Sequence, residues 1–416
     1  MGRRATFLVL VLIGIVVAQG HADPQRGSAP SPTAGRDAIV PFRIQVSDAV
    51  LADLKQRLAR TRFPDEIRGA GWDYGTDLTY LKTLVTYWRD TFDWRAAERR
   101  LNQFSQFKTN IDGLEIHFIH QRSSNPNAMP LVLTHGWPGS IVEFTKVIGP
   151  LTDPVGHGGR AEDAFHVVAI SLPGFGFSGK PAERGYGPER VAGIIAKLMA
   201  RLGYSRYGAQ GGDWGSAISR FVALNDASHV AGLHLNFCLA GAPAGVKDPN
   251  EGVSGIELER MRARQAFFDG ERGYFQIQST KPQTIGYALD DSPAGLAAWI
   301  VEKFRSWCDC GGDVEKAFTK DDLLTNIMIY WVTQTGASSA RIYYESQRAT
   351  PAQGRVSVPT ACAVFPKEIN IPPRRWVEAS YNLTRWTEMP RGGHFAAMEQ
   401  PDLLVGDLRT FFRDLR

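Results

Sequence analysis

The sequence has little cysteine, no strong excess of charge of one sign, and no apolar run long enough to cross a bilayer. Four cysteines in 416 residues argue against a dense disulfide framework and a cysteine metal site, although a bridge stays open (Cys238, Cys308, Cys310, Cys362). The formal net charge is only +4, and basic residues are dispersed among acidic ones, so we expect no nucleic acid partner. The apolar run from Phe7 to Ala18 has 12 residues, whereas a membrane-spanning helix needs about 20.

The first 22 residues are typical of a secretory signal. Arg3 and Arg4 precede the apolar run, and Gly20-His21-Ala22 resembles a cleavage site of small residues. We therefore predict a signal peptide over residues 1–22 and an exported protein, either periplasmic or secreted; an uncleaved membrane anchor is the alternative. Residues 23–40 are rich in Pro, Ser, Gly and Ala, which predicts a flexible lead-in.

From residue 41 onward, the hydrophobic patterns predict an α/β protein. Residues 41–125 begin with two amphipathic stretches, around 47–58 and 78–94, and end in a hairpin that turns at Asp112-Gly113. Strands then alternate with helices over 126–239, helix formers and aromatics dominate 240–350, and strand and helix signals return over 351–416. This order predicts a mostly parallel sheet with helices on both faces, an N-terminal extension and a helical lid insertion.

The stretch Gly211-Gly212-Asp213-Trp214-Gly215 has the layout of a nucleophile elbow, a sharp turn between a strand and a helix. The serine-hydrolase form of this turn, G-x-S-x-G, occurs nowhere in the chain. Small flanking residues are needed because the turn leaves no room beside the nucleophile. An ionised carboxylate needs no activating base and can displace a leaving group at saturated carbon, which leaves an ester on the enzyme. A turn in which Asp213 only caps the next helix is the alternative.

Further reactive residues follow the ends of predicted strands. His135-Gly136-Trp137-Pro138 follows the first strand of the alternating region, and His394 follows two glycines near the C-terminus. Glu368 lies just past the strand predicted over 356–365, while Glu378 and Glu388 are alternative acids. Catalytic loops of such sheets lie beyond the carboxyl ends of the strands. The chain order of nucleophile, acid and histidine is that of the strand-turn-helix hydrolases.

Several longer strings resemble the microsomal-type epoxide hydrolases of the α/β-hydrolase fold, over essentially everything from residue 41 to the C-terminus. The matching strings are Tyr87 to Arg95, Ile111 to Ile119, His135 to Ser140, Gly212 to Gly215, Thr280 to Thr284, Asp322 to Asn326 and Arg391 to Ala397. Such strings in one order are more specific than any single motif. The resemblance implies the fold, the lid, and hydrolysis of an epoxide to a vicinal diol through an aspartyl ester.

The resemblance also assigns the chemical steps to residues of this chain. Asp213 corresponds to the nucleophile, His394 to the general base, and Glu368 to the acidic charge-relay partner that holds the histidine in one tautomer. The reaction implied in this way requires no metal and no organic cofactor.

Donors for the two oxygens that gain charge are assigned in the same way. Tyr274 and Tyr343 correspond to the lid tyrosines that bind the epoxide oxygen, with Tyr344 as the alternative to Tyr343. The backbone N–H groups of Trp137 and Trp214 would form the oxyanion hole. Contacts with the substrate are expected from three further residues of the same loop, His135, Gly136 and Pro138.

The sequence thus predicts an epoxide hydrolase, with a lipophilic epoxide as substrate because the lid is apolar and aromatic. A haloalkane dehalogenase is the nearest alternative, since it uses the same fold, the same Asp-Trp elbow and the same ester chemistry. A non-catalytic ligand-binding protein of this fold is the second alternative. An oligomer is left open.

Overall fold

The computed structural model describes residue 35 and residues 37–416, so the predicted signal peptide and most of the predicted lead-in lie outside the described residues. A nine-stranded sheet forms within them, with the order β1-β2-β3-β5-β4-β6-β7-β8-β9. The strands are β1 (Val40–Phe42), β2 (Gln106–Ile111), β3 (Leu114–Gln121), β4 (Met129–Thr134), β5 (Phe165–Ile170), β6 (Tyr207–Gly211), β7 (Val230–Leu235), β8 (Val356–Val364) and β9 (Tyr381–Glu388). Every neighbouring pair from β5 to β9 is parallel, whereas β1, β2, β3 and β5 pair antiparallel, which confirms the predicted mostly parallel sheet.

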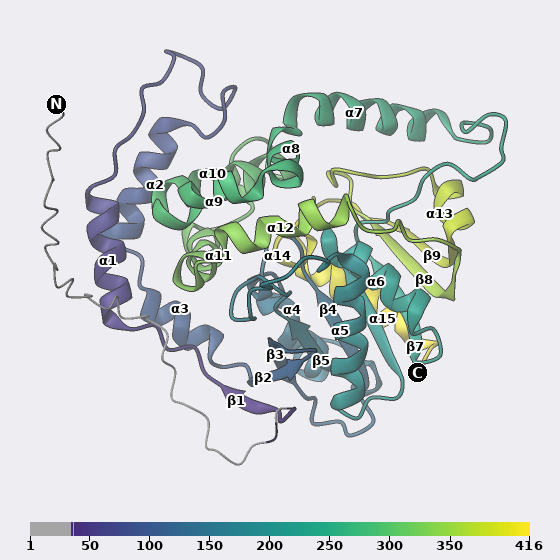
Figure 1. Ribbon diagram of the computed structural model, residues 1–416. Helices are drawn as coiled ribbons and strands as arrows, with labels where there is room; N and C mark the ends of the chain where they lie inside the picture. The colour runs from purple at the N-terminus through teal and green to yellow at the C-terminus, as the bar shows by residue number, and fades with distance from the viewer. Residues whose placement is uncertain (1–34, 36) are drawn as a thin grey trace, which may run out of the picture. The chain divides into compact units, whose positions relative to one another are not determined.

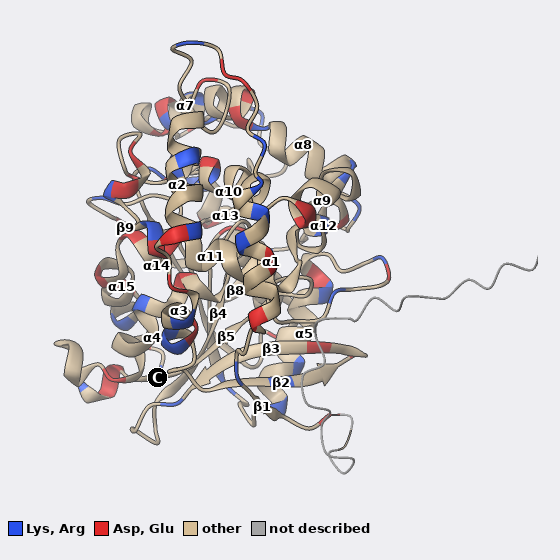
Figure 2. Ribbon diagram, turned by 90° about the vertical axis from the view of Figure 1, so that its left-hand side faces the viewer, with Lys and Arg blue, Asp and Glu red and all other residues tan. Residues whose placement is uncertain are grey.

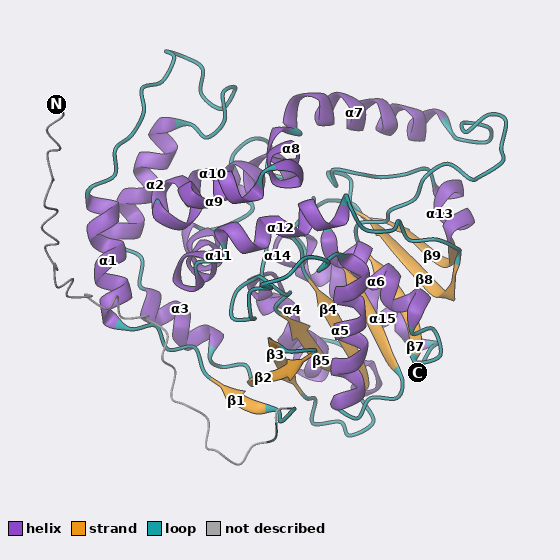
Figure 3. Cartoon of the chain, in the orientation of Figure 1, coloured by secondary structure: helices purple, strands orange, loops and turns teal. Residues whose placement is uncertain are grey.

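Helices cover both faces of this sheet, as predicted (Figures 1 and 3). Strand side chains alternate between two separate apolar clusters: Val132 of β4 belongs to one, and Leu131 and Leu133 belong to the other. The first cluster includes residues of α5 (Pro188–Arg201) and α6 (Trp214–Asn225), and the second includes residues of α4 (Thr145–Thr152) and α15 (Pro401–Arg413). Because successive strand residues face opposite ways, an unbroken apolar strand needs cover on both sides.

Residues before β4 form helices and a hairpin, as predicted. The amphipathic stretch over 78–94 contains α2 (Leu78–Asp90), and the Asp93 side chain accepts a hydrogen bond from the Ala96 N–H to begin a further helix, α3 (Trp94–Leu101). The first helix, α1, spans Asp48–Ala59. The hairpin of β2 and β3 turns at Asp112-Gly113, where both residues have positive φ.

Six helices lie between β7 and β8, in the stretch predicted as a helical insertion. They are α7 (Gly255–Glu271), α8 (Gly273–Thr280), α9 (Pro282–Asp291), α10 (Pro293–Trp307), α11 (Lys320–Thr333) and α12 (Gly336–Ser346). Helix α12 packs against α8 and α9, and α11 packs against α10 and α3. Helix α7 has no buried residue and extends away from the others (Figure 1). Shorter elements are η1 (Ile141–Phe144), η2 (Val155–His157), η3 (Ala161–Asp163), η4 (Val314–Lys316), α13 (Arg374–Ser380) and α14 (Ala396–Glu399).

Acidic and basic side chains are interspersed over the helices in the view of Figure 2, in keeping with the small net charge. Within residues 37–416, none of the helices combines the length and the apolar character that a bilayer span requires.

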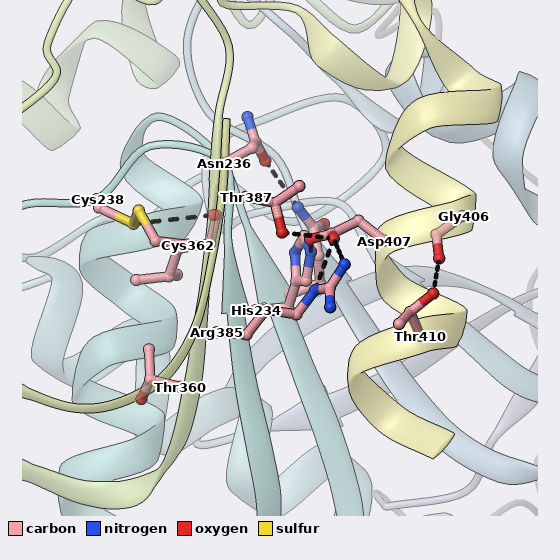
Figure 4. Close-up of polar contacts among 12 residues, drawn as sticks. His234, Asn236, Cys238, Thr360, Cys362, Arg385, Thr387, Gly406, Asp407 and Thr410 are labelled. Atoms are coloured by element: carbon pink, nitrogen blue, oxygen red, sulfur yellow. Dashed lines mark hydrogen bonds and ion pairs between the residues drawn. A yellow bond between two sulfur atoms is a disulfide. The ribbon is translucent and has the colours of Figure 1, made fainter. Parts of the chain in front are cut away.

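All four cysteines are paired, which resolves the bridge that the sequence left open. Cys238, after β7, bonds to Cys362 of β8, and Cys308 bonds to Cys310 after α10. The first bridge joins two neighbouring parallel strands near the ends where the predicted catalytic residues follow (Figure 4).

A buried polar cluster joins the last strands to the C-terminal helix (Figure 4). The carboxylate of Asp407 on α15 is 2% exposed and lies 3.0 Å from His234 Nε2 of β7. It also accepts hydrogen bonds from Arg385 Nε at 2.7 Å and Thr387 Oγ1 at 2.8 Å on β9. Burial would raise the pKa of Asp407, but the hydrogen bonds and charges of its partners, His234 first, lower it to about 2. The charged Asp407 carboxylate therefore holds α15 to β7 and β9, and we call this cluster the charged anchor.

Candidate active site

Asp213 lies at a strained turn between β6 and α6. Its φ of 49° and ψ of −129° are rare for a residue with a side chain, and such backbone is typical of a nucleophile elbow. A Cβ on Gly211 would collide with the Gly215 carbonyl, and a Cβ on Gly215 would collide with the Thr134 carbonyl, so both flanks require glycine. The Asp213 side chain makes no capping hydrogen bond to α6, which speaks against the capping turn. The turn instead directs the carboxylate towards His394 and the Trp137 N–H.

His394 lies between Asp213 and Glu368. Its Nε2 atom is 3.2 Å from Asp213 Oδ2, and its Nδ1 atom is 2.6 Å from Glu368 Oε1. The His394 and Glu368 side chains are each 2% exposed, while that of Asp213 is 17% exposed. The three predicted residues are thus brought together in the arrangement of a nucleophile, a histidine and an acid that orients it.

Local structure fixes the His394 loop. The His394 N–H donates to the Trp307 carbonyl at 3.0 Å, and the Trp307 ring meets the imidazole edge-on at 5.0 Å. A Cβ on Gly393 would come within 2.5 Å of the same carbonyl, so the close approach of this loop to the end of α10 requires glycine. The backbone from Trp307 to Asp309 therefore packs against the loop that carries His394.

Glu368 is the only one of the three candidate acids within reach of His394. It follows β8, whereas Glu378 forms an ion pair with Arg374 at 2.9 Å and Glu388 pairs with Arg260 at 2.8 Å. The sequence also favoured Glu368, because it lies just past the end of a predicted strand.

Electrostatics couple the three groups. Burial alone would lower the pKa of His394, but the charge of Glu368 and the hydrogen bond with Asp213 outweigh it and raise the pKa well above its usual value. Burial raises the pKa of Glu368, and the charge and hydrogen bond of His394 offset this in part. The imidazole consequently holds its proton more tightly while both carboxylates are ionised.

Two backbone N–H groups flank the nucleophile. The Trp137 N–H donates to Asp213 Oδ1 at 2.8 Å. Trp214 is the first residue of α6, so its N–H has no acceptor within the helix. Oδ1 of Asp213 therefore faces the Trp137 N–H while Oδ2 faces His394.

The two predicted tyrosines converge from different helices. Tyr274 of α8 stacks on the Trp137 ring at 5.4 Å, Tyr343 of α12 meets the Trp214 ring at 4.8 Å, and the two tyrosine rings lie 5.8 Å apart. Burial, with the Asp213 charge as a further cause, raises the pKa of both hydroxyls, so both stay protonated at neutral pH. The alternative, Tyr344, stacks instead under Arg348 at 3.4 Å. The structure thus places Tyr343, and not its neighbour, beside the nucleophile.

The three candidate substrate contacts of the His135 loop differ in position. Gly136 lines the cavity beside Asp213, but His135 and Pro138 do not. The imidazole of His135 is buried, donates from Nδ1 to the Gly136 carbonyl at 2.9 Å and accepts from the Leu172 N–H at 3.4 Å. Burial lowers the pKa of His135 to about 4, so it is neutral. These contacts use both ring nitrogens of His135 to hold the loop, and the contacts of His135 and Pro138 with a substrate stay predictions.

Helix α11 clamps the same loop through residues to which the sequence assigned no role. Asn326 donates from Nδ2 to the Pro138 carbonyl at 2.8 Å and accepts from Ser140 Oγ at 2.7 Å. The Tyr330 hydroxyl donates to the Gly139 carbonyl at 2.6 Å. The sequence singled out the string Asp322 to Asn326 only as part of the family resemblance. The contacts of Asn326 with the loop become visible only in the fold.

A further carboxyl group lies in the site and was missed. Glu143 of η1 lines the cavity beside Asp213 and His394. Burial raises the pKa of Glu143 to about 8, although the charge of His394 lowers it. The spacing Ser140-x-x-Glu143 is that of a helix capping box, so the sequence alone does not indicate another role for Glu143.

Residues 37–416 contain no cluster of three or more side chains suited to hold a metal ion.

The chain is similar to known proteins in both sequence and structure. Residues 39–144 match the family model described as epoxide hydrolase N terminus, and residues 129–236 match that of the alpha/beta hydrolase fold. Epoxide hydrolase 1 of Sus scrofa is 42% identical, with 92% of this chain and 91% of that protein covered. The crystal structure of juvenile hormone epoxide hydrolase from the silkworm Bombyx mori matches with a TM-score of 0.84 at 34% identity, covering 91% and 95% of the two chains. The Aspergillus niger epoxide hydrolase structure matches with a TM-score of 0.82 at 33% identity, covering 92% and 98%.

Proposed function

Since the chain belongs to the epoxide hydrolase family of the α/β-hydrolase fold, we propose that Asp213 opens the epoxide and that His394 directs water onto the resulting ester. The observation that carries the proposal is the contact of His394 with both Asp213 and Glu368, at 3.2 and 2.6 Å. A base oriented by an acid and aimed at a carboxylate nucleophile can serve a two-step displacement.

In the first step, Asp213 Oδ2 attacks one ring carbon and the bond from that carbon to the epoxide oxygen breaks. The alkoxide that leaves is a poor leaving group, so it needs donors as charge develops. Tyr274 and Tyr343 supply two hydroxyls without a permanent charge, and their raised pKa keeps them protonated. The alkoxide takes a proton from one of these hydroxyls, and the product of this step is an ester between Asp213 and the substrate.

In the second step, His394 takes a proton from water, whose oxygen attacks Cγ of Asp213. The N–H groups of Trp137 and Trp214 stabilise the oxyanion that forms. The bond between Cγ and the ester oxygen, Oδ2 of Asp213, then breaks, that oxygen takes the proton from His394, and a vicinal diol leaves. Asp213 is regenerated with one oxygen from water, and the second proton of that water returns to the tyrosine that protonated the alkoxide.

We propose that the substrate is lipophilic, because the two lid tyrosines are packed among aromatic rings. Tyr274 contacts Trp137, and Tyr343 contacts Trp214 and Phe275. A panel of mono-substituted and cis-disubstituted aryl and alkyl epoxides tests this. Turnover of small polar epoxides alone would contradict it.

We also propose that the chain is exported and detoxifies reactive epoxides. The basic residues and apolar run of the N-terminus support export, and so do two disulfides, which persist in oxidising compartments. N-terminal sequencing of the periplasmic and culture fractions tests export: a start near Asp23 is expected, and a full-length chain in the membrane fraction would favour the anchor.

A single turnover in H₂¹⁸O tests the two-step chemistry. With enzyme in excess over styrene oxide, the label should enter the peptide that contains Asp213 and not the first diol released, because the diol takes its second oxygen from the carboxylate. Label in the first diol and none in the peptide would mean direct attack of water on the epoxide.

A further inference from the structure

A small cavity lies next to the catalytic carboxylate. Its volume is about 10 Å³ for the centre of a water-sized sphere, which is room for about one water. Asp213 and His394 line it together with residues of η1 and of the neighbouring strands β4 and β6. None of its lining residues comes from α7–α12, the helices that carry Tyr274 and Tyr343. The cavity is therefore separate from the side of Asp213 on which the epoxide oxygen would be held.

Two buried polar atoms in the walls of this cavity have no partner in the described protein. They are Oγ1 of Thr134, which is 0% exposed, and Oε1 of Gln210, which is 2% exposed. A buried hydroxyl or amide oxygen without a hydrogen bond is costly, and a bound water is the usual way to satisfy it. The Gln210 amide is fixed because its Nε2 donates to Asn236 Oδ1 at 2.8 Å. Thr134 and Gln210 thus offer a water two fixed partners.

Glu143 lines the same cavity on the side of η1. Its carboxyl group occupies the space that a side chain at position 139 would fill, because a Cβ on Gly139 would collide with Glu143 Oε1. The turn of η1 begins with Ser140, whose hydroxyl bonds to Asn326, so Glu143 is held on a rigid support. A water in the cavity would then have Glu143, Thr134 and Gln210 to bind it and His394 to remove its proton.

We propose that this cavity holds the water that hydrolyses the ester, and that Glu143 is the residue that positions it, with Thr134 and Gln210 as further partners. The inference rests on the two-step mechanism proposed above. A neutral Glu143 carboxyl adds no second negative charge beside Asp213, which agrees with the raised pKa of Glu143. Glu143 accepts a hydrogen bond from the water while the proton goes to His394 and the oxygen goes to Cγ of Asp213.

Single-turnover rapid-quench kinetics with styrene oxide separate the two steps, since the ester on Asp213 is counted by mass spectrometry at each time point. In Glu143→Ala, we expect formation of the ester at the wild-type rate and its hydrolysis slowed by about 10²-fold, as for a misplaced reactant. Glu143→Gln keeps a carbonyl acceptor of the same shape and should restore most of that loss. Thr134→Val removes a hydroxyl without a protein partner and should slow hydrolysis by about 5- to 10-fold without lowering the melting temperature.

Thr145→Val is the matched control. The Thr145 hydroxyl bonds to the Val142 carbonyl beside η1 but does not line the cavity, so neither step should change. Hydrolysis at the wild-type rate in Glu143→Ala and Thr134→Val would overturn the inference and leave the two-step mechanism intact. Equal slowing of both steps with a lower melting temperature would assign Glu143 a structural role and also overturn it. Absence of any ester in the wild type and all variants would overturn the mechanism itself.

Discussion

The Nε2 atom of His394 lies 3.2 Å from Oδ2 of Asp213, so one imidazole nitrogen faces the oxygen that would become part of the ester. While Asp213 is ionised, its charge and hydrogen bond help to raise the pKa of His394. Alkylation removes that charge, which lowers the pKa and frees the nitrogen to accept a proton from water. The same contact thus makes the neutral form of the histidine available at the moment when a base is needed.

Tyr343→Phe should lower the rate of ester formation by about 10²-fold, because one of two donors to the developing alkoxide is lost. Tyr344→Phe is the control, since Tyr344 stacks under Arg348 and not beside Trp214. Rapid-quench measurement of ester formation compares the two variants. An equal loss in Tyr344→Phe, or no loss in Tyr343→Phe, would contradict the assignment of Tyr343.

Glu368→Gln should slow hydrolysis of the ester by about 10³- to 10⁴-fold, as expected when the acid that orients a catalytic histidine is neutralised. Because the charge of Glu368 helps to raise the pKa of His394, its loss should also lower that pKa. A general base works above its pKa, so the acidic limb of the pH–rate profile should move to lower pH while the maximum falls. Glu378→Gln, on the surface beside Arg374, should leave the profile unchanged; an unshifted limb in Glu368→Gln would count against the pairing.

Asp407→Asn should reduce the free energy of unfolding at pH 7 by about 3 kcal/mol, because it breaks the buried contacts with Arg385 and His234. The folded pKa of Asp407, about 2, is below the ordinary value of 3.8. A depressed pKa contributes stability above pH 4, here about 2 kcal/mol, and this is lost as the pH falls towards 2. Urea unfolding at several pH values should therefore show the gap to wild type narrowing in acid. Asp402→Asn, on the same helix, is the control, and a gap independent of pH would refute the charged anchor.

The parts of the fold that the sequence predicted well depend on local pattern. Alternating strands and helices, the Asp112-Gly113 hairpin and the glycines around Asp213 each have a cause within a few residues, such as a positive φ or a close backbone approach. The position of the break between α2 and α3 is harder to predict because the apolar spacing continues through Trp94, while the Asp93 cap that divides the helices is a single side chain.

The site was harder to predict in full because several assignments depend on contacts between distant segments. Neighbouring residues such as Tyr343 and Tyr344 differ only in which helix face meets the Trp214 ring. The sequence places His135 beside the nucleophile, but its burial and its bond to the Gly136 carbonyl become visible only in the folded loop. The position of Glu143 in the cavity follows from packing against Gly139, and no spacing rule would reveal it.

Intact-protein mass spectrometry of His394→Ala, incubated with styrene oxide, tests the central claim most directly. Without the base, the ester should form and persist, so the mass should rise by one substrate, and peptide mapping should place the addition on Asp213. Asp213→Ala should show no addition. The mechanism would be contradicted if His394→Ala gained no mass from epoxides, gained it at another residue, or gained it only from a haloalkane.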